Sequence, residues 1–334
     1  MIKVAIVGAS GYAGAELCRL ISTHDKIELA GLFVSEHSLD KDKKISELYG
    51  SLEGRCDLIL KPLSGAKDII ASGANAVFLA TDHKVSHDLA PELTDAGIAV
   101  FDLSGAFRIS NLDVFEKAYG FAHEHTDLLK SAVYALGEFV DVKQLQATKM
   151  ISLPGCYPTA SQLALRPLID AGLLDLNYRP SINAVSGVSG AGRKAKITNS
   201  FCEVSLNAYG VFTHRHQPEI AEHLGTEVIF TPHLGNFKRG IHATINAKLK
   251  DNVTLADVQK AYSVYDNKPL VRVKSGMPKL QDVQNLPFCD LGFAVKDNYI
   301  VVCSCIDNLL KGASAQALQV LNLYYGFEET KGLF

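Results

Sequence analysis

Short apolar runs that stop at glycine or at a polar residue recur along the first half of the chain. The run over residues 3–8 leads through a glycine-rich turn into residues 15–22, where apolar side chains recur at helical spacing. Further apolar runs cover residues 27–35, 74–81 and 96–104, with short segments of helical character between them. Strands that alternate with short helices predict a Rossmann-type, doubly wound parallel sheet.

The second half has longer apolar runs with fewer helical segments between them. These runs cover residues 180–190, 226–234, 240–250 and 299–307. Strands that follow one another in this way predict a largely antiparallel mixed sheet with helices on one side, which is an α+β domain. Residues 308–327 have apolar side chains at helical spacing and predict a long helix that stops near Gly326.

The change of pattern predicts two domains, 1–150 and 151–307. A chain of 334 residues is long enough for two domains, and 47% hydrophobic with 21% charged residues is typical of a soluble globular protein. The fold class predicted from the sequence is therefore α/β, with a second α+β domain.

Charge and cysteine usage exclude several classes of function. The formal net charge is −3 and no basic block occurs, so we expect no nucleic-acid partner. No apolar run approaches the roughly 20 residues that cross a bilayer, and the N-terminus lacks a signal-like pattern, so we expect a cytoplasmic protein without membrane contact. The seven cysteines are scattered without metal-ligand spacing, so we expect neither a disulfide framework nor a metal.

The turn GASGYAG over residues 8–14 carries the first candidate site. Between a strand and a helix, its glycines allow a tight turn and let backbone N–H groups approach a pyrophosphate. The alternative is a tight turn that binds nothing. The expected cofactor-binding residues are Gly8, Ser10, Gly11, Tyr12, Ala13 and Gly14.

The end of the second strand bears on which dinucleotide would bind. An NAD site places an acid there to hold the ribose 2′-hydroxyl, whereas this chain has Ser35. Glu36 is an unfavourable neighbour for a 2′-phosphate, but several basic residues follow it: His37, Lys41, Lys43 and Lys44. The sequence therefore favours NADP, with Ser35 among the cofactor-binding residues.

Cys156 is the candidate nucleophile. Residues 147–152 predict a strand, and Pro158 suits the first position of the helix that follows. A cysteine at such a turn lies beside unpaired N–H groups and the helix dipole, which stabilise a thiolate. The alternative is a buried, inert cysteine, which is the commoner case.

The stretch THRHQPEI offers a candidate base. His214 and His216 are two residues apart, and Pro218 marks a helix start with Glu219 in its first turn. Glu219 is therefore expected to orient His216, as a carboxylate does in other nucleophile and base pairs. A solvated polar turn is the alternative, and a metal site would lack a third ligand.

Two further segments offer candidate substrate contacts. Residues 186–195 form a glycine- and serine-rich loop that includes Ser186 and Gly187 and closes with Arg193 and Lys194. Exposed N–H groups and two cations would make an oxyanion or phosphate site, unless the loop is only a flexible turn. Arg108 follows a strand, at the edge of the sheet where α/β proteins bind ligands, and the alternative is a surface arginine.

Taken together, these stretches closely resemble the N-acetyl-gamma-glutamyl-phosphate reductase family, which is related to aspartate-semialdehyde dehydrogenase. The resemblance spans almost the whole chain and rests on six stretches: GASGYAGAEL (8–17), LPGCYPTA (153–160), SGVSGAGRKA (186–195), HRHQPEI (214–220), FTPHLGNFKRGI (230–241) and IDNLLKGASAQALQ (306–319). The chain departs from the usual pattern in Leu153, where Asn is usual, and in Gly105 and Ala106, where Ala and Asp are usual.

The resemblance implies roles for the candidate residues. Cys156 matches the nucleophile and His216 the acid/base, with His214 and Glu219 in the same site. It further implies an NADP-binding Rossmann domain that the helix over 308–327 completes, and a second domain for catalysis and oligomer contacts. A homodimer or homotetramer is the implied assembly.

The implied reaction belongs to arginine biosynthesis. NADPH would drive the reductive dephosphorylation of N-acetyl-L-glutamyl 5-phosphate to N-acetyl-L-glutamate 5-semialdehyde and phosphate, through a cysteine thioester. An aspartate-semialdehyde dehydrogenase or a related acyl-phosphate reductase would use the same chemistry on another small-molecule substrate. A non-catalytic NADP(H)-sensing module is a third alternative, which the joint presence of Cys156 and His216 disfavours.

Overall fold

The chain forms two compact units. The computed structural model describes all 334 residues except for the side chain of Thr198. The first unit contains Met1–Gly155 together with Ala313–Phe334, and the second contains Cys156–Gly312. Among the described residues, no helix is long and apolar enough to cross a membrane.

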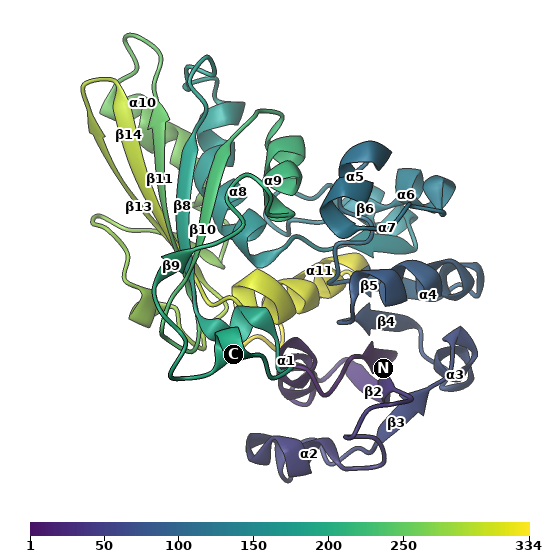
Figure 1. Cartoon of the computed structure of the whole chain (residues 1–334). Helices are drawn as coiled ribbons and strands as arrows, with labels where there is room; N and C mark the ends of the chain where they lie inside the picture. Colours follow the sequence, from purple (N-terminus) through teal and green to yellow (C-terminus); the bar gives the residue numbers. More distant parts are fainter. The chain divides into compact units, whose positions relative to one another are not determined.

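The first unit is built on a seven-stranded parallel sheet (Figure 1). The strand order is β3-β2-β1-β4-β5-β7-β6, which confirms the predicted doubly wound sheet. The strands are β1 (Ile2–Val7), β2 (Ile27–Ser35), β3 (Leu60–Leu63), β4 (Ala76–Leu79), β5 (Ala99–Asp102), β6 (Val133–Tyr134) and β7 (Met150–Ser152). Strands β4 and β5 are buried along their whole length, as expected for central strands covered on both faces.

Helices connect these parallel strands. They are α1 (Tyr12–Ile21), α2 (Ile45–Leu48), α3 (Ala66–Ala71), α4 (His83–Asp95), α5 (Leu112–Tyr119), α6 (Thr126–Ser131) and α7 (Val142–Ala147). The helix expected near the C-terminus is α11 (Ala315–Tyr325), which packs against α1 and α7 and ends at Gly326 in the left-handed conformation. Residues Leu310–Ser314 before it form a π-helical turn, so the α-helix is shorter than the predicted 308–327.

The second unit is a seven-stranded mixed sheet in the order β12-β13-β14-β11-β8-β10-β9. Four strand pairs are antiparallel, and β8/β10 and β12/β13 are parallel, which confirms the predicted mixed sheet. The strands are β8 (Ser181–Ser186), β9 (Asn207–Ala208), β10 (Ile229–Leu234), β11 (Ile241–Lys248), β12 (Val271–Val273), β13 (Cys289–Lys296) and β14 (Tyr299–Ile306).

Helix α8 (Cys156–Asp170) is the central helix of the second unit (Figure 1). It packs on β11 and β14, and α9 (His216–Leu224) and α10 (Leu255–Tyr262) pack against it. Tyr262 and Tyr265 donate hydrogen bonds of 2.6 Å to carbonyl oxygens of α8. These contacts fix α8, and with it the residue at its first position.

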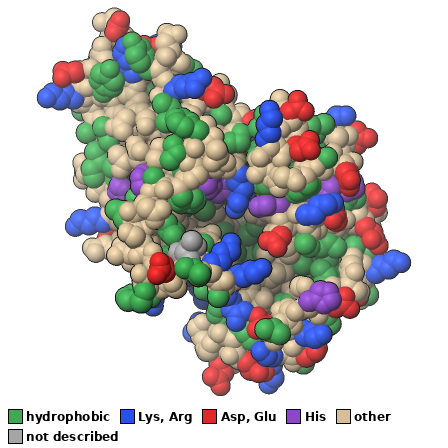
Figure 2. All heavy atoms as spheres, viewed as in Figure 1, with side chains coloured by type: hydrophobic (Ala, Val, Ile, Leu, Met, Phe, Trp, Pro, Cys, Tyr) green, Lys and Arg blue, Asp and Glu red, His purple; other side chains and the backbone are tan. Residues whose placement is uncertain are grey.

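Charged side chains of both signs share the drawn surface. Figure 2 shows Lys and Arg side chains interspersed with Asp and Glu side chains on this face. The surface segment after residue 195 also exposes large apolar side chains, with Phe201 exposed to 97% and Phe212 to 68%.

Candidate active site

Cys156 is the first residue of α8. The helix begins two residues earlier than expected, so Pro158 is its third residue and the cysteine lies within the first turn. Pro158 is tolerated there because first-turn N–H groups have no partner within the helix. Cys156 is not in a disulfide and is partly buried, and the helix start provides the positive end of a dipole beside it.

Gly312 packs directly against Cys156. A Cβ atom on Gly312 would lie 2.8 Å from the Cys156 Cβ, so no larger residue fits without displacing the cysteine. Gly312 lies in the π-helical turn before α11, and its N–H donates to the Asp307 carbonyl oxygen at 2.9 Å. Sequence reasoning missed this residue, whose only signal is a glycine inside an otherwise helical pattern.

A cavity of about 540 Å³ lies in front of the cysteine. Five of the predicted site residues line it: Cys156, Ser186, Gly187, His214 and His216. Arg193 and Lys194 are exposed and are not among the described residues that line it. The cations that line it in the described part of the chain are Lys196 and Arg215, which the sequence interpretation did not select.

His214 has a defined hydrogen-bonding role. Its Nδ1 accepts a hydrogen bond of 3.1 Å from the backbone N–H of His216. Burial, and secondarily the charge of Arg215, lowers the pKa of His214 to about 4. The ring is therefore neutral near pH 7, and because Nδ1 is an acceptor, the proton is assigned to Nε2. His214 is a hydrogen-bond donor rather than a base.

His216 begins helix α9, which starts two residues before the predicted Pro218. Its side chain is only 7% exposed and lines the cavity, and its ring centroid is 4.8 Å from that of His214. Glu219 follows three residues later in the first turn and is fully buried. Residues spaced by three lie on the same side of a helix, as the predicted pairing of Glu219 with His216 requires.

Two tyrosines complete the wall of the cavity and were missed from the sequence. The hydroxyl groups of Tyr157 and Tyr209 are 3.3 Å apart, and that of Tyr157 donates to the His233 carbonyl oxygen at 3.1 Å. Both rings contact His214, with centroid distances of 5.8 and 5.5 Å. Burial raises the pKa of both phenols, so they stay neutral.

The loop that starts at Ser186 is closed by its own hydrogen bonds. The N–H groups of Gly187, Val188 and Ser189 donate to carbonyl groups of residues 237–240 at 2.9–3.0 Å. The expectation that this loop exposes its N–H groups to an anion is wrong for these residues. Asn308 ties the two segments, because its Oδ1 accepts from the Gly240 N–H at 2.7 Å and its Nδ2 donates to the Ser189 Oγ at 3.0 Å.

The glycine turn before α1 fits a pyrophosphate. Gly8 has a φ of +80°, and a Cβ on it would lie 2.2 Å from the Ala80 carbonyl oxygen. A Cβ on Gly14 would lie 2.4 Å from the Gly8 carbonyl oxygen. Helix α1 starts at Tyr12 without an acidic residue in its first turn, so its N–H groups and dipole favour an anion.

The end of β2 carries Ser35, exposed at the last position of the strand. Its Oγ accepts from the His37 N–H at 3.3 Å, and the Lys41 ammonium group donates to the Glu36 carbonyl oxygen at 3.2 Å. A hydroxyl and a lysine therefore lie where an NAD site would have an acid.

Arg108 is neither a surface arginine nor an open substrate contact. It is only 5% exposed and donates to the carbonyl oxygens of Leu153 and Leu103, each at 2.7 Å. It thus holds the segment after β5 to the segment after β7, within the first unit. The presence of glycine at position 105 is explained by its surroundings, because a Cβ there would lie 2.2 Å from the Tyr119 hydroxyl oxygen.

Family models match both units. Residues 3–147 match the semialdehyde dehydrogenase NAD binding domain, and residues 156–308 match the semialdehyde dehydrogenase dimerisation domain. Solved structures give the same fold. An aspartate semialdehyde dehydrogenase II from Vibrio cholerae aligns with a TM-score of 0.74 at 15% identity, and the alignment covers 98% of both chains.

Curated relatives are much closer in sequence. The N-acetyl-gamma-glutamyl-phosphate reductases of Escherichia coli O157:H7 and Pasteurella multocida are each 56% identical over 335 residues. That of Salmonella typhimurium is 57% identical over 338 residues, and all three alignments cover the whole of both chains. The chain therefore belongs to the N-acetyl-gamma-glutamyl-phosphate reductase family of semialdehyde dehydrogenase-like proteins.

Proposed function

We propose that the chain catalyses the NADPH-dependent conversion of N-acetyl-L-glutamyl 5-phosphate to N-acetyl-L-glutamate 5-semialdehyde and phosphate, a step of arginine biosynthesis. The observation that carries the proposal is the placement of Cys156 and His216 at the first positions of two helices that line one cavity. A thiol nucleophile and an imidazole base are what a thioester mechanism requires.

In the first half-reaction, His216 takes the proton of the Cys156 thiol. The thiolate forms a bond to the acyl carbon, and the bond from that carbon to the phosphate oxygen breaks. The imidazolium returns its proton to the leaving phosphate, which Lys196 and Arg215 attract from the cavity wall. The product of this step is a thioester on Cys156.

In the second half-reaction, the reduced nicotinamide supplies hydride to the thioester carbonyl when it is bound. His214 donates from Nε2–H to the carbonyl oxygen and holds the acyl group in place throughout the reaction. The carbon–sulfur bond then breaks, the aldehyde leaves, and the thiolate takes up a proton from solvent through His216. Glu219 orients the His216 ring from the first turn of α9.

The remaining predicted contacts belong to the same proposal. Ser186 and Gly187 form the part of the cavity wall against which the substrate lies, and Arg193 and Lys194 add positive charge at the exposed end of the loop. Arg108 supports substrate binding by holding the residues that precede Cys156. In the first unit, the turn over residues 8–14 holds the pyrophosphate and Ser35 lies at the 2′-phosphate.

The role of Cys156 as the nucleophile is tested in the reverse reaction, with the semialdehyde, phosphate and NADP as substrates. We expect Cys156→Ser to lose nearly all turnover and to keep its affinity for NADPH. The matched control is Cys202→Ser, since Cys202 is an exposed free cysteine of the same unit that does not line the cavity. Full activity of Cys156→Ser would refute the mechanism, and preferred turnover of aspartate semialdehyde would assign another substrate.

The two histidines are tested by a comparison of kcat with KM. We expect His216→Asn to lower kcat by about 10²-fold or more and to remove a titration from the pH–rate profile. His214→Asn should mainly raise KM, because a neutral donor binds the carbonyl oxygen in both ground and transition states. The opposite pattern would transfer the proton-transfer role to His214.

The assembly that we propose is a cytoplasmic homodimer or homotetramer, without nucleic acid or membrane as a partner. The match to a dimerisation domain and the exposed side chains of Ile197, Phe201 and Phe212 in the same unit support self-association. Light scattering coupled to size-exclusion chromatography would contradict the proposal if the purified chain eluted as a monomer at micromolar concentration.

A further inference from the structure

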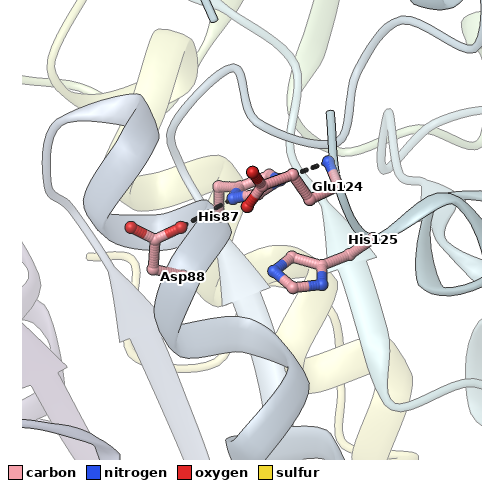
Figure 3. Close-up of side chains that lie close together, drawn as sticks. All are labelled: His87, Asp88, Glu124 and His125. Atoms are coloured by element: carbon pink, nitrogen blue, oxygen red, sulfur yellow. Dashed lines mark hydrogen bonds and ion pairs between the residues drawn. The ribbon is translucent and has the colours of Figure 1, made fainter. Parts of the chain in front are cut away.

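Four side chains that the proposed reaction does not use lie together in the first unit. His87 and Asp88 come from α4, and Glu124 and His125 come from the segment between α5 and α6 (Figure 3). Each offers one potential ligand atom, and these atoms all lie within 4.8 Å of one another. Imidazole nitrogens and carboxylate oxygens gathered in this way are the donor types that bind Zn²⁺ in proteins.

His87 positions the other three side chains. It is fully buried, and its Nε2 accepts a hydrogen bond of 3.1 Å from the backbone N–H of Glu124. The ring proton is thereby assigned to Nδ1, which donates to the Asp88 carboxylate at 2.8 Å (Figure 3). His87 thus holds one carboxylate and the backbone that carries the other two groups, as residues behind metal ligands do.

The other three groups remain accessible to an ion. The side chains of Asp88 and Glu124 are 51% and 69% exposed, and His125 is partly buried. The His125 imidazole lies among the two carboxylates and offers a ring nitrogen to the ion. One imidazole and two carboxylates leave further coordination positions to water.

A cation already lies at these carboxylates. The ammonium group of Lys84 is 2.5 Å from the Asp88 Oδ1 and 3.9 Å from the Glu124 Oε2, and its side chain is 50% exposed. The two carboxylates therefore already hold one positive charge, and an incoming ion would displace a half-exposed lysine side chain.

We propose that Asp88, Glu124 and His125 bind a divalent transition-metal ion such as Zn²⁺, that His87 positions Asp88 for it, and that Lys84 competes with the ion. Because the ligands come from α4 and from the segment before α6, the ion joins two elements of the first unit.

The test is a zinc titration of the full chain against a chromophoric chelator. All variants carry Cys156→Ser, so that the thiolate of the proposed active site does not bind the metal. We expect His125→Asn to weaken one zinc site by about tenfold or more, and Lys84→Met to strengthen the same site several-fold. His223→Asn on α9 is the matched histidine control and should change nothing at this site.

Zinc sites elsewhere on the chain are common to all variants and cancel in the comparison. Equal zinc affinity with and without His125, or weaker binding in Lys84→Met, would overturn the proposal. A crystal soaked with Zn²⁺ gives an independent answer: we expect an anomalous peak about 2.0–2.2 Å from His125 and Asp88. The absence of that peak would also overturn the proposal.

Discussion

Two glycine-rich turns, one in each unit, look alike in sequence and differ in what their backbone does. The turn over residues 8–14 runs into α1, so the N–H groups at the helix start have no partner within the helix. The turn that begins at Ser186 donates successive N–H groups to residues 237–240. The first turn therefore leaves N–H groups at a helix start for a ligand, whereas the second uses its N–H groups to bind a neighbouring segment of the chain.

This difference changes how each turn is expected to contact a phosphate. In the first unit we expect the contact to be through the backbone of a tight turn, in which Gly8 and Gly14 leave no room for a Cβ beside neighbouring backbone atoms. In the second unit the N–H groups of residues 187–189 are already used, so substrate contacts come from side chains around the cavity. A glycine-rich pattern therefore indicates a tight turn, and the residues that follow decide whether it binds an anion.

Among changes to the two turns, the largest effect is expected from Gly14→Val in the first turn. The added Cβ would lie 2.4 Å from the Gly8 carbonyl oxygen and 2.6 Å from the Ala9 Cα, and the backbone has no room to move without opening the turn. Overpacking of this kind costs about 1–3 kcal/mol, so NADPH affinity should fall roughly 10- to 100-fold. The affinity for NADPH is measured by NADPH fluorescence, and the chain has no tryptophan whose fluorescence would interfere.

The matched control for that variant is Gly65→Ala. A Cβ on Gly65 would have no atom within 4 Å, although the residue lies in the same unit and precedes a helix. Unchanged NADPH affinity in both variants would mean that the turn over residues 8–14 does not bind the cofactor.

A substitution in the second turn should impair the reaction of the acyl phosphate and leave NADPH affinity unchanged. In Gly187→Ala the Cβ would lie 2.6 Å from the Arg239 backbone nitrogen, so the loop would separate from its partner segment and Ser186 would shift. We expect kcat/KM for the acyl phosphate to fall about tenfold while NADPH affinity stays unchanged. Gly276→Ala, whose Cβ meets no atom within 4 Å, is the control in the same unit. Weaker NADPH binding in Gly187→Ala would break the comparison between the turns.

The preference for NADPH over NADH tests the role of Ser35 in the first unit. Ser35→Asp places a carboxylate at the end of β2, where it would repel a 2′-phosphate and accept a hydrogen bond from a 2′-hydroxyl. We expect NADPH to weaken by about tenfold relative to NADH, measured as the ratio of the two kcat/KM values. Ser38→Asp serves as the control, because it adds the same charge three residues beyond the strand. A wild-type preference for NADH would contradict this interpretation of Ser35.

Most of the fold was predictable because its signals are local. The run from β1 through the glycine turn to α1 follows from periodicity and glycine placement alone. Short strands such as β3 and β12 were missed, since three or four residues show no period. Strand β13 was missed because its glycine and charged residues interrupt the apolar pattern.

The candidate site was predictable as far as residue chemistry and helix starts allow. Cys156 and His216 were found because prolines mark the two helices, although each helix starts two residues earlier than the proline suggested. The closure of the loop at Ser186 and the contact of Gly312 with Cys156 were not predictable. Both depend on residues about 50 and 150 positions away in the chain, which no local pattern specifies.

The smallest expected effect is on the KM for the acyl phosphate when a lysine after Ser186 is removed. It distinguishes phosphate binding by Lys196 in the cavity from phosphate binding by Lys194 at the exposed end of the loop. If phosphate is held by side chains that line the cavity, Lys196→Ala should raise KM for the acyl phosphate by about fivefold, the size of an exposed charge interaction. Lys194→Ala is the matched control, because it removes the same charge from the same loop but from outside the lining residues. Its effect on KM should be smaller than twofold. Salt should reduce the Lys196 effect, since exposed charges are screened. A larger KM change in Lys194→Ala would return phosphate binding to the exposed end of the loop, as the sequence alone suggested.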